Sequence, residues 1–146
     1  GGVIDTWTML EPLLSVQKVI NVPVVKHHAR TKLTCGLKNW FGLIGGERQR
    51  LHEHLHVAIA DLAVFMRPTL TVVDGTRVML RNGPRGGNID DTAEKNTVIA
   101  SIDPVAADSL ACGLLGLRPD QIEYLRLAEA RGVGTTNWQR LRSREV

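Results

Sequence analysis

The sequence predicts a single α/β domain with a layered, at least partly parallel sheet and flanking helices. Three apolar runs rich in β-branched residues, at 19–25, 69–74 and 97–102, are typical of strands buried in a sheet. Apolar residues at helical spacing between 48 and 66 predict a helix that connects the first strand to the second. Because strands alternate with helices and no internal repeat is present, we expect one domain over residues 1–146.

The first elements have clear boundaries. Pro23 cannot donate a hydrogen bond to a neighbouring strand, so strand 19–25 is expected at a sheet edge or broken near Pro23. Pro68 ends the helix, and strand 69–74 then runs into Gly75.

The second half of the chain gives further signals. Residues 78–80 predict a short strand, and the glycines and proline within 82–96 predict a loop. Asp103-Pro104 is typical of a helix N-cap followed by the first helical residue, and we expect this helix to end at Gly116. A last helix is expected over residues 119–131.

The composition excludes several classes of protein. The 146 residues are 43% apolar, and no apolar run approaches the roughly 18 residues of a membrane span. Cys35 and Cys112 are too few for an iron–sulfur cluster, which takes about four thiolates. Nucleic acid is not an expected partner, since only Trp40 and Phe41 interleave with basic residues.

Three strands make a thin sheet, because α/β domains usually contain more. We therefore expect the chain to be the C-terminal part of a larger α/β domain, or a homo-oligomer in which a second copy completes the sheet. The first residue is Gly1 rather than Met, and no export signal follows it. A cytoplasmic protein and one exported by an upstream signal both remain open.

Positive charge is concentrated in one segment. Residues 26–50 hold six basic residues against Glu47 alone, a net charge of +5. Such a segment favours an anionic ligand.

Chemistry-bearing residues lie where predicted strands end. Lys26 and His28 follow the first strand, and Asp74 ends the second; carboxyl ends of parallel strands are where α/β proteins place ligands. Asp108 is the one charge on an apolar helix and needs a partner, which we expect to be a basic residue between Lys26 and Lys38. These residues predict a site for a small anion or a divalent metal ion. An ordinary polar strand end and a structural Asp108 are the alternatives.

The stretch His52-Glu53-His54-Leu55-His56 matches the H-E-x-x-H pattern of zinc hydrolases. On a helix, His52 and His56 would face one zinc ion, with Glu53 as general base. A third protein ligand is not evident, and both histidines border the apolar stripe. A zinc-dependent hydrolase is therefore the alternative function, and a solvated edge of the core is the simpler reading.

Seven separate blocks of sequence carry a family resemblance: Asn21–His28, Gly36–Gly42, His52 with Ala58–Leu62, Thr71–Asp74, Asn82–Pro84 with Gly86–Gly87, Ala100–Asp108 and Ala128–Gly134. In this order they resemble the domain-of-unknown-function family numbered 362, over about residues 17–134. Residues 135–146 are expected to form a basic C-terminal tail.

The resemblance brings no established reaction with it. Members of the family often look like partners of ferredoxin-type iron–sulfur modules, and many carry export signals, which implies a redox-associated or metal-associated role. This chain has neither a cysteine cluster nor a signal, and a stretch that precedes the Lys26 block in the family is absent. We therefore expect a ferredoxin-type domain in the full-length protein.

The blocks also select the candidate site residues. Expected ligand-binding residues are Lys26, His28, Lys38, Asn39, Asn82 and Asp103, and expected metal ligands are His28, His52, Asp74 and Asp108.

Overall fold

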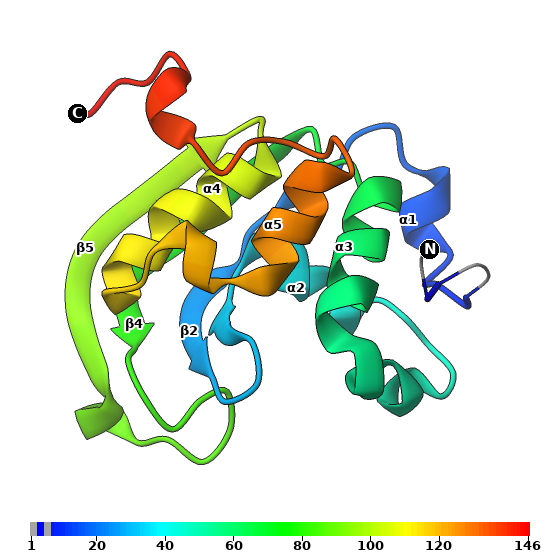
Figure 1. Cartoon of the computed structure of the whole chain (residues 1–146), viewed down its shortest axis with the longest axis horizontal. Helices are drawn as coiled ribbons and strands as arrows, with labels where there is room; N and C mark the ends of the chain where they lie inside the picture. The colour runs from blue at the N-terminus through cyan, green and yellow to red at the C-terminus, as the bar shows by residue number, and fades with distance from the viewer. Residues whose placement is uncertain (1–2, 5–6) are drawn as a thin grey trace.

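A computed structural model describes residues 3–4 and 7–146 and shows an α/β fold with a five-stranded sheet (Figure 1). The strands are β1 (Ile20–Asn21), β2 (Val24–His28), β3 (Lys32–Thr34), β4 (Leu70–Met79) and β5 (Thr92–Ser101). The α-helices are α1 (Pro12–Ser15), α2 (Gly36–Asn39), α3 (Leu55–Phe65), α4 (Pro104–Ala111) and α5 (Glu123–Ala130). Short 3-10 helices are η1 (Trp40–Gly42), η2 (Arg48–His54), η3 (Ile89–Asp91), η4 (Cys112–Leu115), η5 (Pro119–Gln121) and η6 (Trp138–Arg140).

The long strand β4 is the centre of the sheet. β1 and β2 both pair with it in parallel, β5 pairs with it antiparallel, and β3 pairs antiparallel with β2. The predicted break near Pro23 is confirmed, since β1 ends at Asn21 and β2 begins at Val24. The sheet is therefore mixed, with its parallel part around β4.

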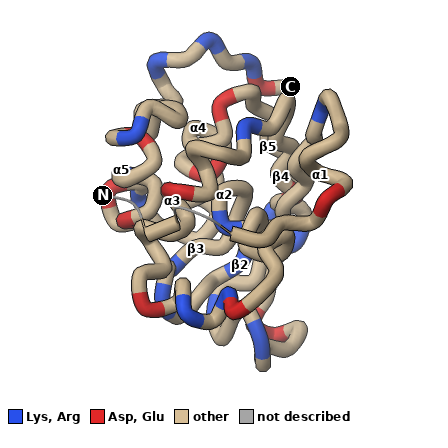
Figure 2. The backbone as a smooth tube through the Cα atoms, turned by 90° about the vertical axis from the view of Figure 1, so that its right-hand side faces the viewer, with Lys and Arg blue, Asp and Glu red and all other residues tan. Residues whose placement is uncertain are grey.

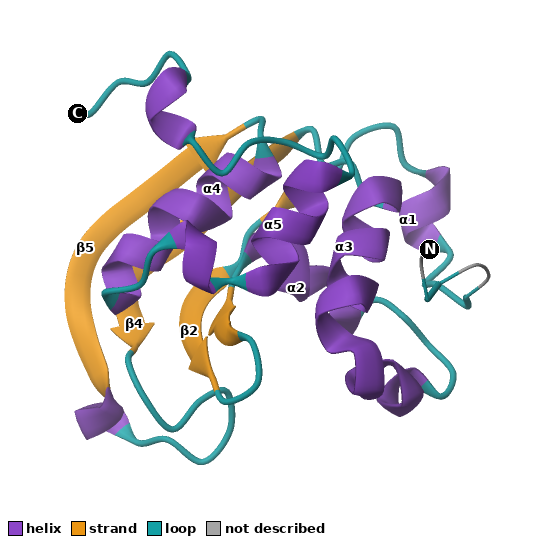
Figure 3. Ribbon diagram, in the orientation of Figure 1, coloured by secondary structure: helices purple, strands orange, loops and turns teal. Residues whose placement is uncertain are grey.

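The larger helices lie on one side of the sheet (Figure 3). Helix α4 contacts β4 and β5, while α3 packs against α5. The core between the helices and the sheet contains fully buried side chains such as Val73, Val105 and Tyr124. Burying this apolar area is the main favourable term in folding.

The local signals around α4 are confirmed. The Asp103 side chain accepts the N–H of Ala106 at 2.9 Å, and Pro104 is the first helical residue. Gly116 has the left-handed backbone, φ +68°, that ends the turn η4 after α4.

Three predicted boundaries differ from the structure. The helix expected over 48–66 is a 3-10 segment followed by α3, because the backbone at His54 leaves the helical region at φ −120°, ψ 43°. Strand β4 does not end at Asp74, since a bulge between Gly75 and Arg77 lets it continue to Met79. Residues 92–96, expected in a loop, begin β5 and pair with the far half of β4.

Within the described ranges, no helix has the length and apolar character needed to cross a membrane.

Candidate functional site

The buried carboxylate of Asp108 holds the start of α2. Its two oxygens accept the backbone N–H groups of Gly36 at 2.7 Å and of Leu37 at 3.1 Å. These donors belong to the first turn of the helix and would otherwise have no partner. The expected partner of Asp108, a basic side chain, was wrong: two backbone N–H groups satisfy the carboxylate instead.

Gly36 is required at this contact because a Cβ atom there would lie 2.8 Å from Asp108 Oδ1. The Gly36 carbonyl accepts the side-chain amide of Asn21 at 2.9 Å, and Asn39 in turn donates to Asn21 Oδ1 at 2.8 Å. Asn39, expected to bind ligand, is thus engaged in the network that fixes α2. Lys38 belongs to the same four-residue helix, so this network also positions Lys38.

Lys38 lies in a group of basic side chains that surrounds Phe41. The Lys38 Nζ sits 5.2 Å from the centroid of the Phe41 ring, and the His52 ring meets Phe41 edge-on at 6.0 Å. Arg48 donates to the Phe41 carbonyl at 3.4 Å, and Arg30 donates to the His52 carbonyl at 2.9 Å. We call Arg30, Lys38, Arg48 and His52 the basic cluster.

The basic cluster carries electrostatic strain. Burial, and then repulsion from Arg48, lower the pKa of Lys38 below its usual value. Burial, followed by repulsion from Lys38 and His52, lowers the pKa of the neighbouring His28 to about 4. His28 is therefore neutral at pH 7, and its Nδ1 accepts the N–H groups of Arg30 and Thr31 at 3.1 and 3.2 Å.

The charge of this cluster is not balanced by neighbouring acids. In the part of the chain that the structure describes, Arg30, Lys38 and Arg48 form no ion pair, whereas other arginines, such as Arg131 with Asp61, do. Figure 2 shows Lys and Arg positions on and around β2 and β3. An anion would relieve the repulsion between these side chains.

A cavity of about 470 Å³ adjoins the basic cluster, and its lining residues are Arg30, Gln49, His52, Glu53, Leu55 and His56. Arg30 and His52 belong to both the cluster and the cavity. The Nδ1 atoms of His52 and His56 are buried without a hydrogen-bond partner among the described residues. The lining of the cavity therefore includes one guanidinium, two imidazoles, one amide and one carboxylate.

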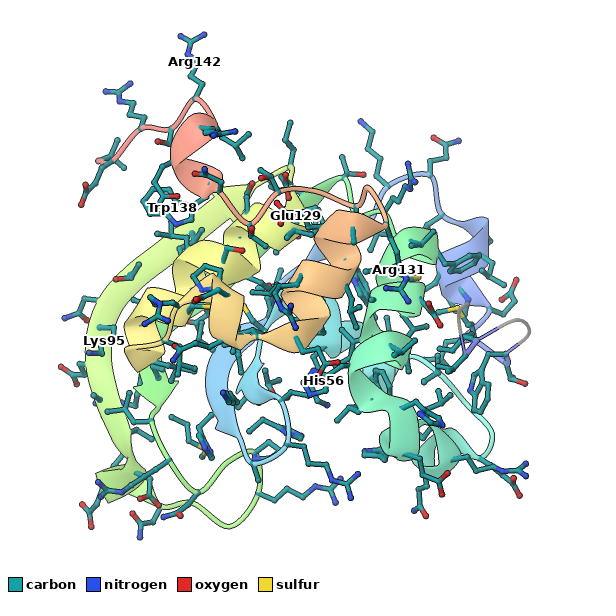
Figure 4. The ribbon with its side chains drawn as sticks, viewed as in Figure 1. His56, Lys95, Glu129, Arg131, Trp138 and Arg142 are labelled. Carbon is teal, nitrogen blue, oxygen red and sulfur yellow. The ribbon has the colours of Figure 1, made fainter. Side chains whose placement is uncertain are left out.

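The H-E-x-x-H residues do not lie on one continuous α-helix. His52 and Glu53 belong to η2, while His56 belongs to α3. His56 lies between α3 and α5 (Figure 4), stacked on Tyr124 at 6.2 Å with its Nε2 3.8 Å from Glu123. The two histidines thus have different neighbours, although both line the cavity.

The remaining predicted residues serve other contacts. Asp74 lies at the bulge in β4, where its carboxylate accepts the N–H and hydroxyl of Thr76, and these bonds lower its pKa. Asn82 donates to Asp91 at 3.0 Å within the glycine-rich loop. Asp103 caps α4, and Lys26 lies in β2 opposite Thr34 and Met79.

The four expected metal ligands are not gathered. Among residues 3–4 and 7–146, no group of three or more His, Cys, Asp or Glu side chains is placed to hold a metal ion. Asp108 is fully buried against α2, and Asp74 lies at the bulge, so neither meets His28 and His52.

The two cysteines lie in the core beside Asp108. Both are fully buried, and burial raises the pKa of Cys35 well above its usual value and that of Cys112 to about 12. Their thiols stay protonated at neutral pH. Burial likewise raises the pKa of Asp108 to about 6, although the bonds from Leu37 and Gly36 act in the opposite direction.

The candidate residues predicted from the sequence include Lys38, His28 and His52, but not Arg30, Arg48 or Phe41, which the structure places beside them. The concentration of basic residues in 26–50 was the signal that contained them. Spacing alone could not show that a 3-10 turn brings His52 to the ring of Phe41.

Fold and site together define an α/β domain with a basic site beside the β2–β3 hairpin. The chain belongs to the family described as Domain of unknown function (DUF362), whose model matches residues 1–113. It is also similar to a thylakoid-associated protein of Synechocystis sp., with 30% identity over 127 residues, which are 81% of this chain and 38% of that protein. The chain thus spans well under half of the curated relative that it matches, and no solved structure matches it.

Proposed function

We propose that this domain binds a small oxyanion, of the phosphate or carboxylate type, at the basic cluster. The observation that carries the proposal is the half-buried ammonium of Lys38, which lies close to Arg48 without a carboxylate partner among the described residues. Burying a cation is unfavourable unless an anion accompanies it. A bound oxyanion would supply that partner.

The neighbouring side chains suit such a ligand. Arg30 offers a guanidinium, which binds carboxylate and phosphate in two parallel hydrogen bonds. The imidazole of His52, which lines the adjoining cavity, offers a further polar contact. The cavity next to the cluster gives room for the rest of a small ligand.

A titration of the ¹⁵N-labelled chain with inorganic phosphate tests the proposal, with chloride adjusted to keep the ionic strength constant. Saturable shifts are expected at the amides around Lys38, Phe41 and His52, and they should be lost in Lys38→Met. The Lys95→Met variant is the matched control, because Lys95 is exposed on β5 (Figure 4). Shifts that are linear in phosphate, or equal in both variants, would count against the site.

Zinc-dependent hydrolysis is the second candidate, because His52, Glu53 and His56 all line the cavity. The split between η2 and α3, and the contacts of His56 with Glu123 and Tyr124, weigh against it. Stoichiometric zinc in the purified chain, lost in His56→Ala but kept in His54→Ala, would favour the hydrolase over anion binding.

We further propose that any iron–sulfur chemistry associated with this domain resides on a partner module. The support is the burial of Cys35 and Cys112, which keeps both thiols protonated and away from solvent. Iron and sulfide analysis of the chain purified without oxygen should give background values. Stoichiometric iron would contradict this proposal without affecting the anion site.

A further inference from the structure

One face of the sheet is apolar and uncovered. Figures 1 and 3 show α3, α4 and α5 on the same side of the sheet. On the other side Ile20 and Val98 are 61% and 64% exposed, and Ile102, just after β5, is 82% exposed. A contiguous group of exposed apolar side chains, unlike a single one, marks an interaction surface.

The strand register shows that these side chains are neighbours. Ile20 lies opposite Leu70, and Val72 lies opposite Ala100. Asp74 lies between Val24 and Val98. We define the apolar face by its described members: Ile20, Val22, Val24, Leu70, Val72, Val98, Ala100 and Ile102.

Buried and partly exposed side chains alternate along β4, as expected for a strand with one face toward the helices and a second face away from them. Thr71 and Val73 point to the helices and are fully buried, whereas Leu70 and Val72, which alternate with them along the strand, are partly exposed. Sheets with parallel strands are usually covered on both faces. The described residues supply a cover for only one.

We propose that a second copy of this chain covers the apolar face, so that two sheets stack in a two-fold dimer. Side chains of this number and exposure present on the order of 600 Å² per copy, close to the roughly 800 Å² per partner of a specific interface. A two-fold arrangement sets the same apolar patch against itself, which needs no second partner.

The charges at the two ends of the face support this arrangement. Asp74 lies between Val24 and Val98, at the end of the face toward the bulge in β4. Lys18 and Arg67 are exposed near the opposite end, just before β1 and β4. If the strands of the two copies run in opposite directions, Asp74 of each copy approaches the basic end of the other.

Sedimentation velocity on the chain tests the proposal over protein concentrations around a dissociation constant on the order of 1 µM. The wild-type chain should dimerise, and Val98→Lys should be monomeric. This substitution is compatible with the folded monomer because the new ammonium lies opposite Asp74 in the β4–β5 register. Phe65→Lys is the matched control, since Phe65 is 60% exposed on α3, outside the apolar face, and it should leave the dimer intact.

Ile20→Lys provides a second variant should Val98→Lys fail to fold, and it should also be monomeric. A wild-type chain that stays monomeric throughout the range would overturn the proposal and assign the face to another part of a longer polypeptide. A dimer that survives both lysine substitutions would overturn it as well. Lys38→Met should not change the association, which separates this proposal from anion binding.

Discussion

The backbone N–H of Gly36 donates to the buried carboxylate of Asp108 at 2.7 Å, although the two residues are 72 positions apart in the sequence. This bond joins α4 to the start of α2, the short helix that carries Lys38. The core of the domain and its basic cluster are therefore one connected structure. Substitutions at either residue test that connection.

Replacement of Gly36 by alanine should destabilise the domain. The added Cβ would lie 2.8 Å from Asp108 Oδ1 and 3.3 Å from Asn21 Nδ2. Both side chains would have to shift, which should lower the free energy of unfolding by about 2 kcal/mol. Gly113→Ala is the matched control, because its Cβ has no atom within 4 Å and its backbone is not left-handed. Urea unfolding should show a loss for Gly36→Ala and little change for Gly113→Ala. Equal effects would show that the space beside Asp108 is not restrictive.

The Asp108→Asn variant should lose a pH dependence that the wild-type chain has. Burial raises the pKa of Asp108 to about 6 from 3.8, so the folded state binds the proton more tightly. The stabilisation from protonation is present below pH 3.8 and is lost as the pH rises through about 6, by about 3 kcal/mol. Urea unfolding of both proteins between pH 4 and 7 measures the difference. A constant difference would contradict a buried, proton-binding carboxylate.

His28→Gln should change the pH profile in the opposite sense. The pKa of His28 is lowered from 6.5 to about 4, so between these values the unfolded state binds more protons than the folded state. The loss of folding stability caused by the low pKa of His28 is absent above pH 6.5 and grows as the pH falls toward 4. The wild-type chain should therefore lose stability relative to His28→Gln on acidification. The exposed His54→Gln serves as control and should follow the wild-type profile.

Lys38→Met should stabilise the anion-free domain. The substitution removes a half-buried charge that Arg48 repels, and we expect this gain to exceed the loss of the contact between the Lys38 Nζ and the Phe41 ring. The expected gain is about 0.5 kcal/mol, the size of charge interactions near a surface. Thermal unfolding in a phosphate-free buffer measures it, beside Lys95→Met. A loss of stability would mean that Lys38 has a structural role rather than a binding role.

Local signals in the sequence predicted much of the fold. Strand β4, the Asp103 cap of α4 and the left-handed Gly116 depend on neighbouring residues, and all three are present. Strand β3 was missed because it has three residues and begins at Lys32 with φ +63°. Asp74 was placed at a strand end because Gly75 is typical of one, whereas a bulge absorbs it.

The site was harder to predict because it depends on tertiary contacts. The partners of Asp108 are backbone groups, which no side-chain pattern reveals. The basic cluster depends on the meeting of η2 with α2 and η1 around Phe41. Charge density indicated the segment that contains the basic cluster, but only the fold distinguishes Lys38 within this cluster from Lys26 on β2.

In the proposed function, the basic cluster binds an oxyanion through Lys38. Isothermal titration of inorganic phosphate into the wild-type chain, Lys38→Met and Lys95→Met at constant ionic strength and pH 7 tests it most directly. We expect saturable binding of phosphate to the wild-type chain. Its affinity should fall about tenfold or more in Lys38→Met, a loss of at least about 1.4 kcal/mol, and should be unchanged in Lys95→Met. Absence of saturable heat in the wild-type chain, or equal affinity in Lys38→Met, would contradict it.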